Sequence, residues 1–190
     1  MNHEALAMDR ARSYFRDKAA LPASAVVEQI ASAFDSLQAF LADVPPEVAA
    51  RRTVAGEWSI QEIADHLLET YRPGVDELRC LLAGQRPPGD PIPADLQSKA
   101  PLLRPWPWLL EELYRVHRSI LEVIDSVAGE IPGDARAPIV MVVNVPGPDG
   151  STVPLKWVED IEWKAYTLVS WRLHAIDHLK QARKVLAASR

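Results

Sequence analysis

Apolar residues recur at helical spacing in four long stretches of the chain. Such a stripe marks the face that an amphipathic helix buries, so each stretch is predicted to be a helix that packs against the others. The stretches cover residues 26–44, 60–82, 109–124 and about 159–188. Four amphipathic helices of this length joined by loops indicate an all-α fold, a four-helix bundle.

The second of these helices has a well-marked beginning and end. Ser59-Ile60-Gln61-Glu62 is a Ser-x-x-Glu capping box, in which Ser59 and Glu62 satisfy each other's backbone N–H groups at the first turn. Gly84 is predicted to stop the helix, and Pro73 lies inside it, where a proline bends the axis.

Three further segments surround the bundle. Residues from about 4 to 18 are predicted to form an extra N-terminal helix. Seven of the sixteen prolines lie in residues 86–107, which predicts an irregular crossover. Residues 139–145 and 151–157 are strand-like runs separated by Pro-Gly-Pro-Asp-Gly. They predict a small β-hairpin inserted at about 136–158, before the last helix.

The length and composition fit one domain, residues 1–190, with the bundle core at about 26–188. The chain has 190 residues, of which 48% are hydrophobic and 25% charged. A domain of this size buries roughly 70% of the surface of its unfolded chain, so it needs no metal or disulfide for stability. Any metal site is therefore expected to serve function.

Charge and cysteine content narrow the partners and the compartment. The net charge is −5 and no basic run stands out, which argues against nucleic-acid binding. Cys80 is the one cysteine, so no intrachain disulfide or cysteine-based zinc cluster is expected. No apolar stretch reaches the roughly 18 residues of a membrane span, and residues 1–10 do not read as a secretory signal. We expect a soluble cytoplasmic protein without a membrane partner.

The histidines are the candidates for chemistry. His174 and His178 lie four positions apart in the last helix, so both rings project from one face and can share a metal ion. His66 occupies the flank of the apolar stripe in the second helix, and a bundle can bring these flanks together. His117 lies on an apolar stripe itself. It is interpreted either as a hydrogen-bonded core histidine or as a pocket residue that contacts substrate.

The segments Gly56-Glu57-Trp58-Ser59-Ile60-Gln61-Glu62-Ile63-Ala64-Asp65-His66-Leu67 and His174-Ala175-Ile176-Asp177-His178-Leu179-Lys180-Gln181 resemble the DinB/YfiT-like superfamily. This resemblance implies a four-helix bundle in which one histidine of the second bundle helix and an H-x-x-x-H pair of the last helix hold a divalent metal. The matching positions are His66, His174 and His178. Members of the superfamily are described as hydrolases or as transferases that use low-molecular-weight thiols, maleylpyruvate isomerases among them.

Three neutral imidazoles leave coordination positions open, as in a catalytic site. Zinc and nickel are the first candidates, followed by iron and manganese. An open metal site activates water or a thiol at neutral pH. We therefore expect a metal-dependent hydrolase or thiol S-transferase that acts on a small-molecule substrate. A homodimer is expected as well. The alternative is a non-catalytic module, in which the metal stabilises a dimer or a ligand-binding protein.

Two polar residues are candidates for supporting roles. Glu69 is predicted to be a general base or an outer partner of the metal site, with a solvated helix face as the equal alternative. Gln181 lies one turn beyond His178, where it is predicted to bond substrate or a water at the metal. A purely structural role is its alternative.

Overall fold

The computed structural model describes residues 3–127, 134–147 and 151–189 and forms a helical bundle with a small two-stranded sheet. The bundle consists of α2 (Ala23–Ala42), α4 (Ile60–Leu82), α5 (Trp106–Asp125) and a last helix built from three consecutive segments. These segments are α6 (Trp163–Thr167), the π-helical η2 (Leu168–Leu173) and α7 (His174–Ala187). The predicted four-helix bundle is thus present.

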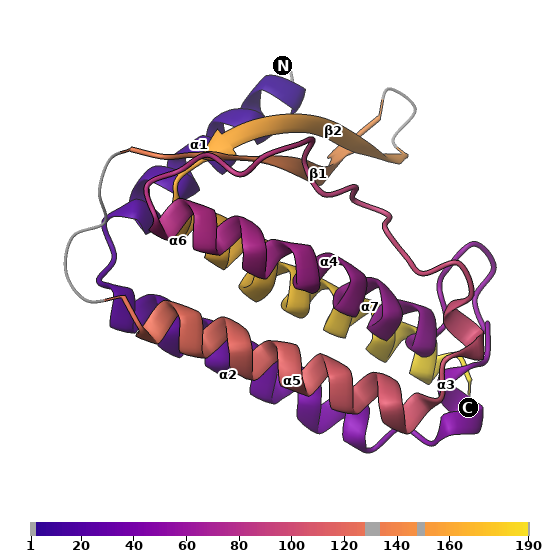
Figure 1. Ribbon diagram of the computed structural model, residues 1–190. Coiled ribbons are helices and arrows are strands. Elements are labelled where there is room, and N and C mark those ends of the chain that lie inside the picture. The colour runs from indigo at the N-terminus through magenta and orange to yellow at the C-terminus, as the bar shows by residue number, and fades with distance from the viewer. Residues whose placement is uncertain (1–2, 128–133, 148–150, 190) are drawn as a thin grey trace.

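The smaller elements lie at the ends and on one side of the bundle. Helix α1 (His3–Ala19) packs against α6 and β1, and two short turns, α3 (Pro46–Ala49) and η1 (Pro101–Leu103), lie near the start of α4. Strands β1 (Ala137–Pro146) and β2 (Thr152–Ile161) pair antiparallel. Figure 1 shows the hairpin and α1 together beside α4 and α6, away from α2 and α5.

The apolar stripes meet in one continuous core. Fully buried side chains come from every bundle helix, and they include Ile30, Phe34, Leu37 and Leu41 of α2, Ile63 and Leu67 of α4, Leu113 and Ile120 of α5, and Leu168 and Ala182 of the last helix. Burial of this apolar surface is the main favourable term for the bundle. It fixes which helix faces point inward, and hence where the histidines lie.

The start of α4 follows the predicted capping box. The hydroxyl of Ser59 accepts a hydrogen bond from the backbone N–H of Glu62 at 3.2 Å, and the Glu62 carboxylate accepts one from the Ser59 N–H at 2.9 Å. Both side chains are buried. Two backbone donors that would otherwise lack partners are satisfied, and the register of α4 is set from its first turn.

The last helix starts later than the sequence pattern predicts. Helix was expected from about residue 159, but β2 continues to Ile161, which pairs with Ala137. The helix begins at Trp163, because the Glu162 carboxylate accepts hydrogen bonds from the backbone N–H groups of Lys164 and Ala165. The hairpin therefore runs three residues beyond its predicted limit of 158 and passes directly into the helix.

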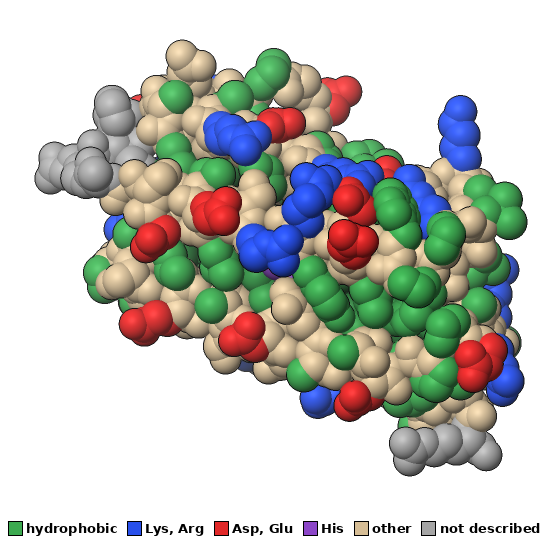
Figure 2. Space-filling model, turned by 60° about the horizontal axis from the view of Figure 1, so that its bottom comes forward, with side chains coloured by type: hydrophobic (Ala, Val, Ile, Leu, Met, Phe, Trp, Pro, Cys, Tyr) green, Lys and Arg blue, Asp and Glu red, His purple; other side chains and the backbone are tan. Residues whose placement is uncertain are grey.

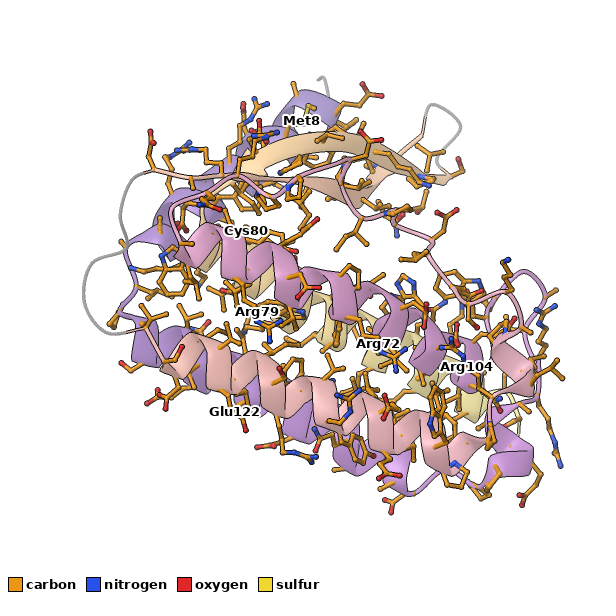
Figure 3. The ribbon with its side chains drawn as sticks, in the orientation of Figure 1. Met8, Arg72, Arg79, Cys80, Arg104 and Glu122 are labelled. Atoms are coloured by element: carbon orange, nitrogen blue, oxygen red, sulfur yellow. The ribbon has the colours of Figure 1, made fainter. Side chains whose placement is uncertain are left out.

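The surface displays charges of both signs. In Figure 2, basic side chains lie directly beside acidic ones. Arg72, seen between α4 and α5 in Figure 3, pairs with Glu112 at 2.7 Å, and Arg115 pairs with the same carboxylate. Within the described residues, no helix has the length and apolar character required to cross a membrane.

Candidate metal centre

His66 from α4 and His174 and His178 from α7 converge at one point of the bundle. Each of the three offers a ligand atom, and these atoms all lie within 4.8 Å of one another. The Nε2 atoms of His66 and His174 are 2.9 Å apart, and the ring of His178 lies 4.7 Å from that of His66. No fourth histidine, cysteine or carboxylate of the described residues joins this group.

The opposite nitrogen of each ring faces a hydrogen-bond acceptor. The acceptors of the three Nδ1 atoms are the carbonyl oxygen of Leu96 for His66 (2.7 Å), the carbonyl oxygen of Ser170 for His174 (3.3 Å) and the side-chain oxygen of Gln181 for His178 (2.9 Å). An oxygen of this kind only accepts, so each Nδ1 carries the ring proton. The Nε2 atoms are left as lone-pair donors.

This donor set fits a divalent cation. With the ring protons on Nδ1, no hydrogen remains between the Nε2 atoms of His66 and His174, whose lone pairs face each other at 2.9 Å. Lone pairs at that distance repel unless a cation lies among them. Histidines that ligate metals are commonly held in this way, with the other ring nitrogen bound to a carbonyl or a side chain. The three-histidine group could therefore hold a metal ion.

The rings are also neutral, as metal ligation requires. Burial lowers the pKa of His66, and burial together with the neighbouring His178 and His66 rings lowers the pKa of His174 well below its usual value. Burial lowers the pKa of His178 to about 4. At neutral pH none of the three carries the extra proton that would exclude a cation.

Aromatic side chains enclose the centre. The ring of Trp58 lies 4.8 Å from that of His66 and stacks at 6.0 Å on His178. Tyr71 meets His174 edge-on at 5.7 Å. Trp58 directly precedes the capping Ser59, so the same turn that starts α4 also places a wall of the site. These contacts restrict the rotation of the imidazoles.

The crossover is fastened to α4 next to His66. The buried carboxylate of Asp65 accepts hydrogen bonds from the N–H and the hydroxyl of Ser98, each at 2.8 Å, and pairs with Arg104 at 2.9 Å. These contacts hold the chain so that the carbonyl of Leu96 reaches His66. Sequence patterns did not predict the roles of Leu96 and Ser98, since both lie in an irregular segment whose position depends on long-range contacts.

Gln181 and Glu69, the two predicted supporting residues, occupy different environments. Gln181 lies behind His178, where its amide nitrogen donates a hydrogen bond to Glu57 at 2.9 Å and its oxygen accepts one from Nδ1 of His178. Glu69 instead accepts a hydrogen bond from Arg104 at 2.6 Å. The structure does not bring Glu69 into the three-histidine group or the cavity next to it, so its position gives no support to a general-base role.

His117 lies in the core. Its ring stacks on Phe34 at 3.8 Å, and its Nδ1 pairs with the amide of Gln38 at 2.7 Å. The other ring nitrogen is buried without a partner. This placement matches the core-histidine interpretation, and burial lowers the pKa of His117 to about 3.

Comparison with known proteins agrees with this architecture. A family model described as the DinB superfamily matches residues 10–147. The chain belongs to the DinB superfamily. This match contains His66 and ends before His174 and His178, so the meeting of α4 and α7 comes from the structure alone.

A four-helix bundle is also found in the comparison with solved structures. The crystal structure of TT2238, a four-helix bundle protein, is similar with a TM-score of 0.51 and 15% sequence identity, covering 86% of this chain and 99% of that one. At this identity the likeness concerns the fold. The comparison with curated proteins gave no match.

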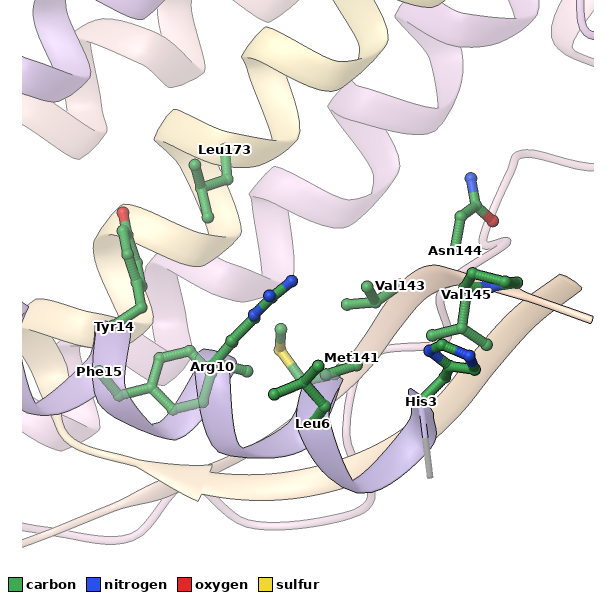
Figure 4. A pocket seen from close by; sticks show the side chains of 13 residues that line it. His3, Leu6, Arg10, Tyr14, Phe15, Met141, Val143, Asn144, Val145 and Leu173 are labelled. Atoms are coloured by element: carbon green, nitrogen blue, oxygen red, sulfur yellow. The ribbon is translucent and has the colours of Figure 1, made fainter. Parts of the chain in front are cut away.

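A cavity of about 440 Å³ adjoins the three histidines of this DinB chain. Its walls come from α4, the last helix, the crossover and β1, and all three histidines line it. A second, mostly apolar cavity of about 530 Å³ lies between α1 and β1 (Figure 4). Met141, Val143 and Leu173 line both cavities.

Proposed function

We propose that this DinB chain is a divalent-metal-dependent enzyme that acts on a small molecule. The observation that carries the proposal is the 440 Å³ cavity lined by His66, His174 and His178. Its volume is in the range of small-molecule sites, and a concave site with a few converging polar groups is the usual form of an active site.

The residues of the chain would divide the work as follows. His66, His174 and His178 hold the ion, Gln181 and the carbonyls of Leu96 and Ser170 fix the ring tautomers, and the aromatic walls limit the entry of water. When bound, a divalent ion with three imidazole ligands supplies a Lewis acid that makes water or a thiol nucleophilic near neutral pH. Hydrolysis and thiol S-transfer both follow from that chemistry.

The donor set narrows the choice of metal only in part. Three imidazoles suit zinc and nickel, which we propose first, and also iron and manganese. A low-molecular-weight thiol is the proposed co-substrate if the chain is a transferase. In that role Gln181 is a positioning residue, and substrate contact would come from the residues that line the cavity.

Two features favour an enzyme over a non-catalytic metal-stabilised module. Among the described residues no fourth protein ligand joins the three histidines, and a cavity adjoins them. A purely structural site is normally closed by four protein ligands. The homodimer, the cytoplasmic location and the lack of nucleic-acid and membrane partners stay predictions, and light scattering on the purified chain would test the dimer.

The metal content of untagged protein tests the proposal. We expect about one equivalent of a divalent metal in the wild type and almost none in a His174→Ala/His178→Ala double variant. A His3→Ala variant is the matched control, because this exposed histidine lies on α1, outside the three-histidine group. Absence of metal from the wild type after reconstitution with zinc, nickel, iron and manganese would sink the proposal.

A second measurement separates catalysis from binding alone. The cobalt-substituted protein is titrated with small thiols, and the absorption spectrum reports whether sulfur reaches the metal. A new sulfur-to-metal band, followed by turnover with electrophilic substrates, is expected for a thiol transferase. Stoichiometric metal with neither thiol ligation nor hydrolysis of ester and amide substrates would favour the non-catalytic module.

A further inference from the structure

The cavity beside the histidines contains a second polar group at its other end. Glu77 of α4 and Tyr166 of α6 both line it, and the Tyr166 hydroxyl donates a hydrogen bond to the Glu77 carboxylate at 2.5 Å. His66 and Glu77 are eleven positions apart on α4, which separates them by about 16 Å along the helix axis at 1.5 Å per residue. The pair is therefore remote from the three-histidine group but lies in the same cavity.

The Glu77 carboxylate lacks a cationic partner within the described part of the chain. Tyr166 occupies one of its oxygens, and no ion pair with lysine, arginine or histidine involves it. Lys156 lines the same cavity but lies beyond ion-pair distance. Burial raises the pKa of Glu77, and the hydrogen bond from Tyr166 opposes that shift. Glu77 is partly buried. A partly desolvated carboxylate without a cation is unfavourable, and a positively charged ligand reduces that cost.

The position of Tyr166 is itself built in by its neighbours. Its side chain is buried, and its hydroxyl lies against Gly74 of α4, where an added Cβ would come within 3.3 Å of the hydroxyl oxygen. Glycine at this point lets the tyrosine reach across to Glu77. Burial and the neighbouring Glu77 carboxylate raise the pKa of Tyr166 well above its usual value, so the hydroxyl keeps its proton and acts as a donor.

We propose that Glu77, oriented by Tyr166, binds a protonated amine of the ligand that occupies this cavity. This proposal rests on the proposed function in so far as the ligand is the enzyme's substrate or co-substrate. Apart from its polar side chains the cavity wall is largely apolar, and it includes Ile139, Met141, Val169 and Leu173. The ligand class is thus an elongated small molecule with an apolar middle, an ammonium group at one end and its reacting group at the other.

Calorimetric titration of metal-free protein tests the amine site without any need for catalysis. The probes are n-octylamine, 1-octanol and octanoate, which share a chain length and differ in the charge of the head group. We expect n-octylamine to bind at least tenfold more tightly than 1-octanol, and octanoate most weakly. The Glu77→Gln variant should lose the preference for the amine while it still binds the alcohol, because it keeps the shape of the side chain and removes its charge.

Asp177→Asn is the matched control, since this carboxylate lines the same cavity but its side chain is 72% exposed. It should leave the ratio of amine to alcohol affinity within about twofold of the wild type. In Tyr166→Phe we expect that ratio to fall, whereas a merely structural tyrosine would weaken both probes equally. Circular dichroism and melting curves verify that every variant is folded.

The results that would overturn the amine site differ from those that would overturn the proposed function. Equal binding of amine and alcohol by the wild type, equal loss in Asp177→Asn and Glu77→Gln, or preferred binding of octanoate would overturn the amine site. The metal content of the same preparations judges the proposed function separately. An amine preference in a protein that holds no metal would retain this inference and remove the enzyme.

Discussion

The side-chain oxygen of Gln181 accepts a hydrogen bond from Nδ1 of His178 at 2.9 Å, and the amide nitrogen of Gln181 donates one to the Glu57 carboxylate at the same distance. Lys184 in turn donates to Glu57 at 2.6 Å. The amide is thereby locked in one orientation, because its nitrogen is committed to a carboxylate. A neutral side chain thus dictates which nitrogen of His178 faces the other two histidines.

This relationship predicts that Gln181 controls metal affinity. The substitution Gln181→Leu removes the acceptor that holds the ring proton of His178 on Nδ1. The proton can then reside on Nε2, where it competes with the metal. Loss of such an outer partner typically weakens metal binding about 10- to 100-fold. Competition with a chelator of known affinity measures the change. Lys180→Met alters an exposed neighbour and should bind as the wild type does; an unchanged affinity in Gln181→Leu would contradict the role.

The start of α4 yields a prediction about stability alone. Ser59→Ala removes one half of the capping box, and loss of a serine N-cap costs about 1 kcal/mol of the free energy of unfolding. Urea unfolding measures this. Ser36→Ala is the control, since Ser36 lies within α2 and its hydroxyl bonds the Ser32 carbonyl of the preceding turn. If both variants lose the same amount, the capping box has no special weight.

Sequence patterns predicted the parts of this fold that depend on local periodicity. The apolar stripes and Ser59-x-x-Glu62 predicted the positions of the bundle helices, because core burial and helix capping both depend on residues that are only three or four positions apart. The H-x-x-x-H pair and His66 were singled out for the same reason: each lies at the border of a stripe. That these three rings form one metal site stays a prediction.

Other features depend on contacts between distant segments, which periodicity does not encode. The carbonyl of Leu96 reaches His66 only because the crossover folds back on α4. The π-helical segment Leu168–Leu173 precedes His174. It rotates the residues of α7 about the helix axis relative to those of α6, compared with a regular α-helix. Glu69 was a candidate because it lies one turn from His66 on the helix, but its carboxylate accepts a hydrogen bond from Arg104 of the crossover. Glu77 and Tyr166 share no local motif.

The burial of His117 leads us to expect that the free energy of unfolding decreases in acid. In the folded state burial lowers the pKa of His117 to about 3, whereas a histidine in the unfolded chain has an ordinary pKa of about 6.5. Below pH 6.5 His117 is protonated in the unfolded chain but stays neutral in the folded chain. The free energy of unfolding therefore decreases as the pH falls from 6.5 to about 3. Between pH 8 and pH 5 the loss from this one group is about 2 kcal/mol.

Urea unfolding at pH 8 and pH 5, with a chelator present, isolates this term. His117→Phe keeps the stacking on Phe34 and removes the titrating group. The wild type should lose about 2 kcal/mol more than the variant over this interval, since the other histidines contribute to both proteins. An identical pH dependence in the two proteins would show that His117 does not titrate as described.

Asp65 attaches the crossover to α4 next to the candidate metal centre. Asp65 is fully buried and holds Ser98 and Arg104. Asp65→Ala should destabilise the fold by about 3 kcal/mol, because the N–H and hydroxyl of Ser98 lose their acceptor and Arg104 keeps only Glu69 as a carboxylate partner. The crossover would also come loose, so the carbonyl of Leu96 would no longer hold His66 and metal affinity would fall.

Limited digestion with trypsin detects this loosening directly. In the crossover Lys99 is followed by alanine, whereas Arg86 and Arg104 are each followed by proline, where trypsin cuts poorly. Cleavage after Lys99 should therefore accelerate in Asp65→Ala and slow again when metal is added. Asp90→Ala removes an exposed carboxylate of the same segment and should be cut at the wild-type rate. Equal rates for all three proteins would mean that Asp65 stabilises α4 without positioning the crossover.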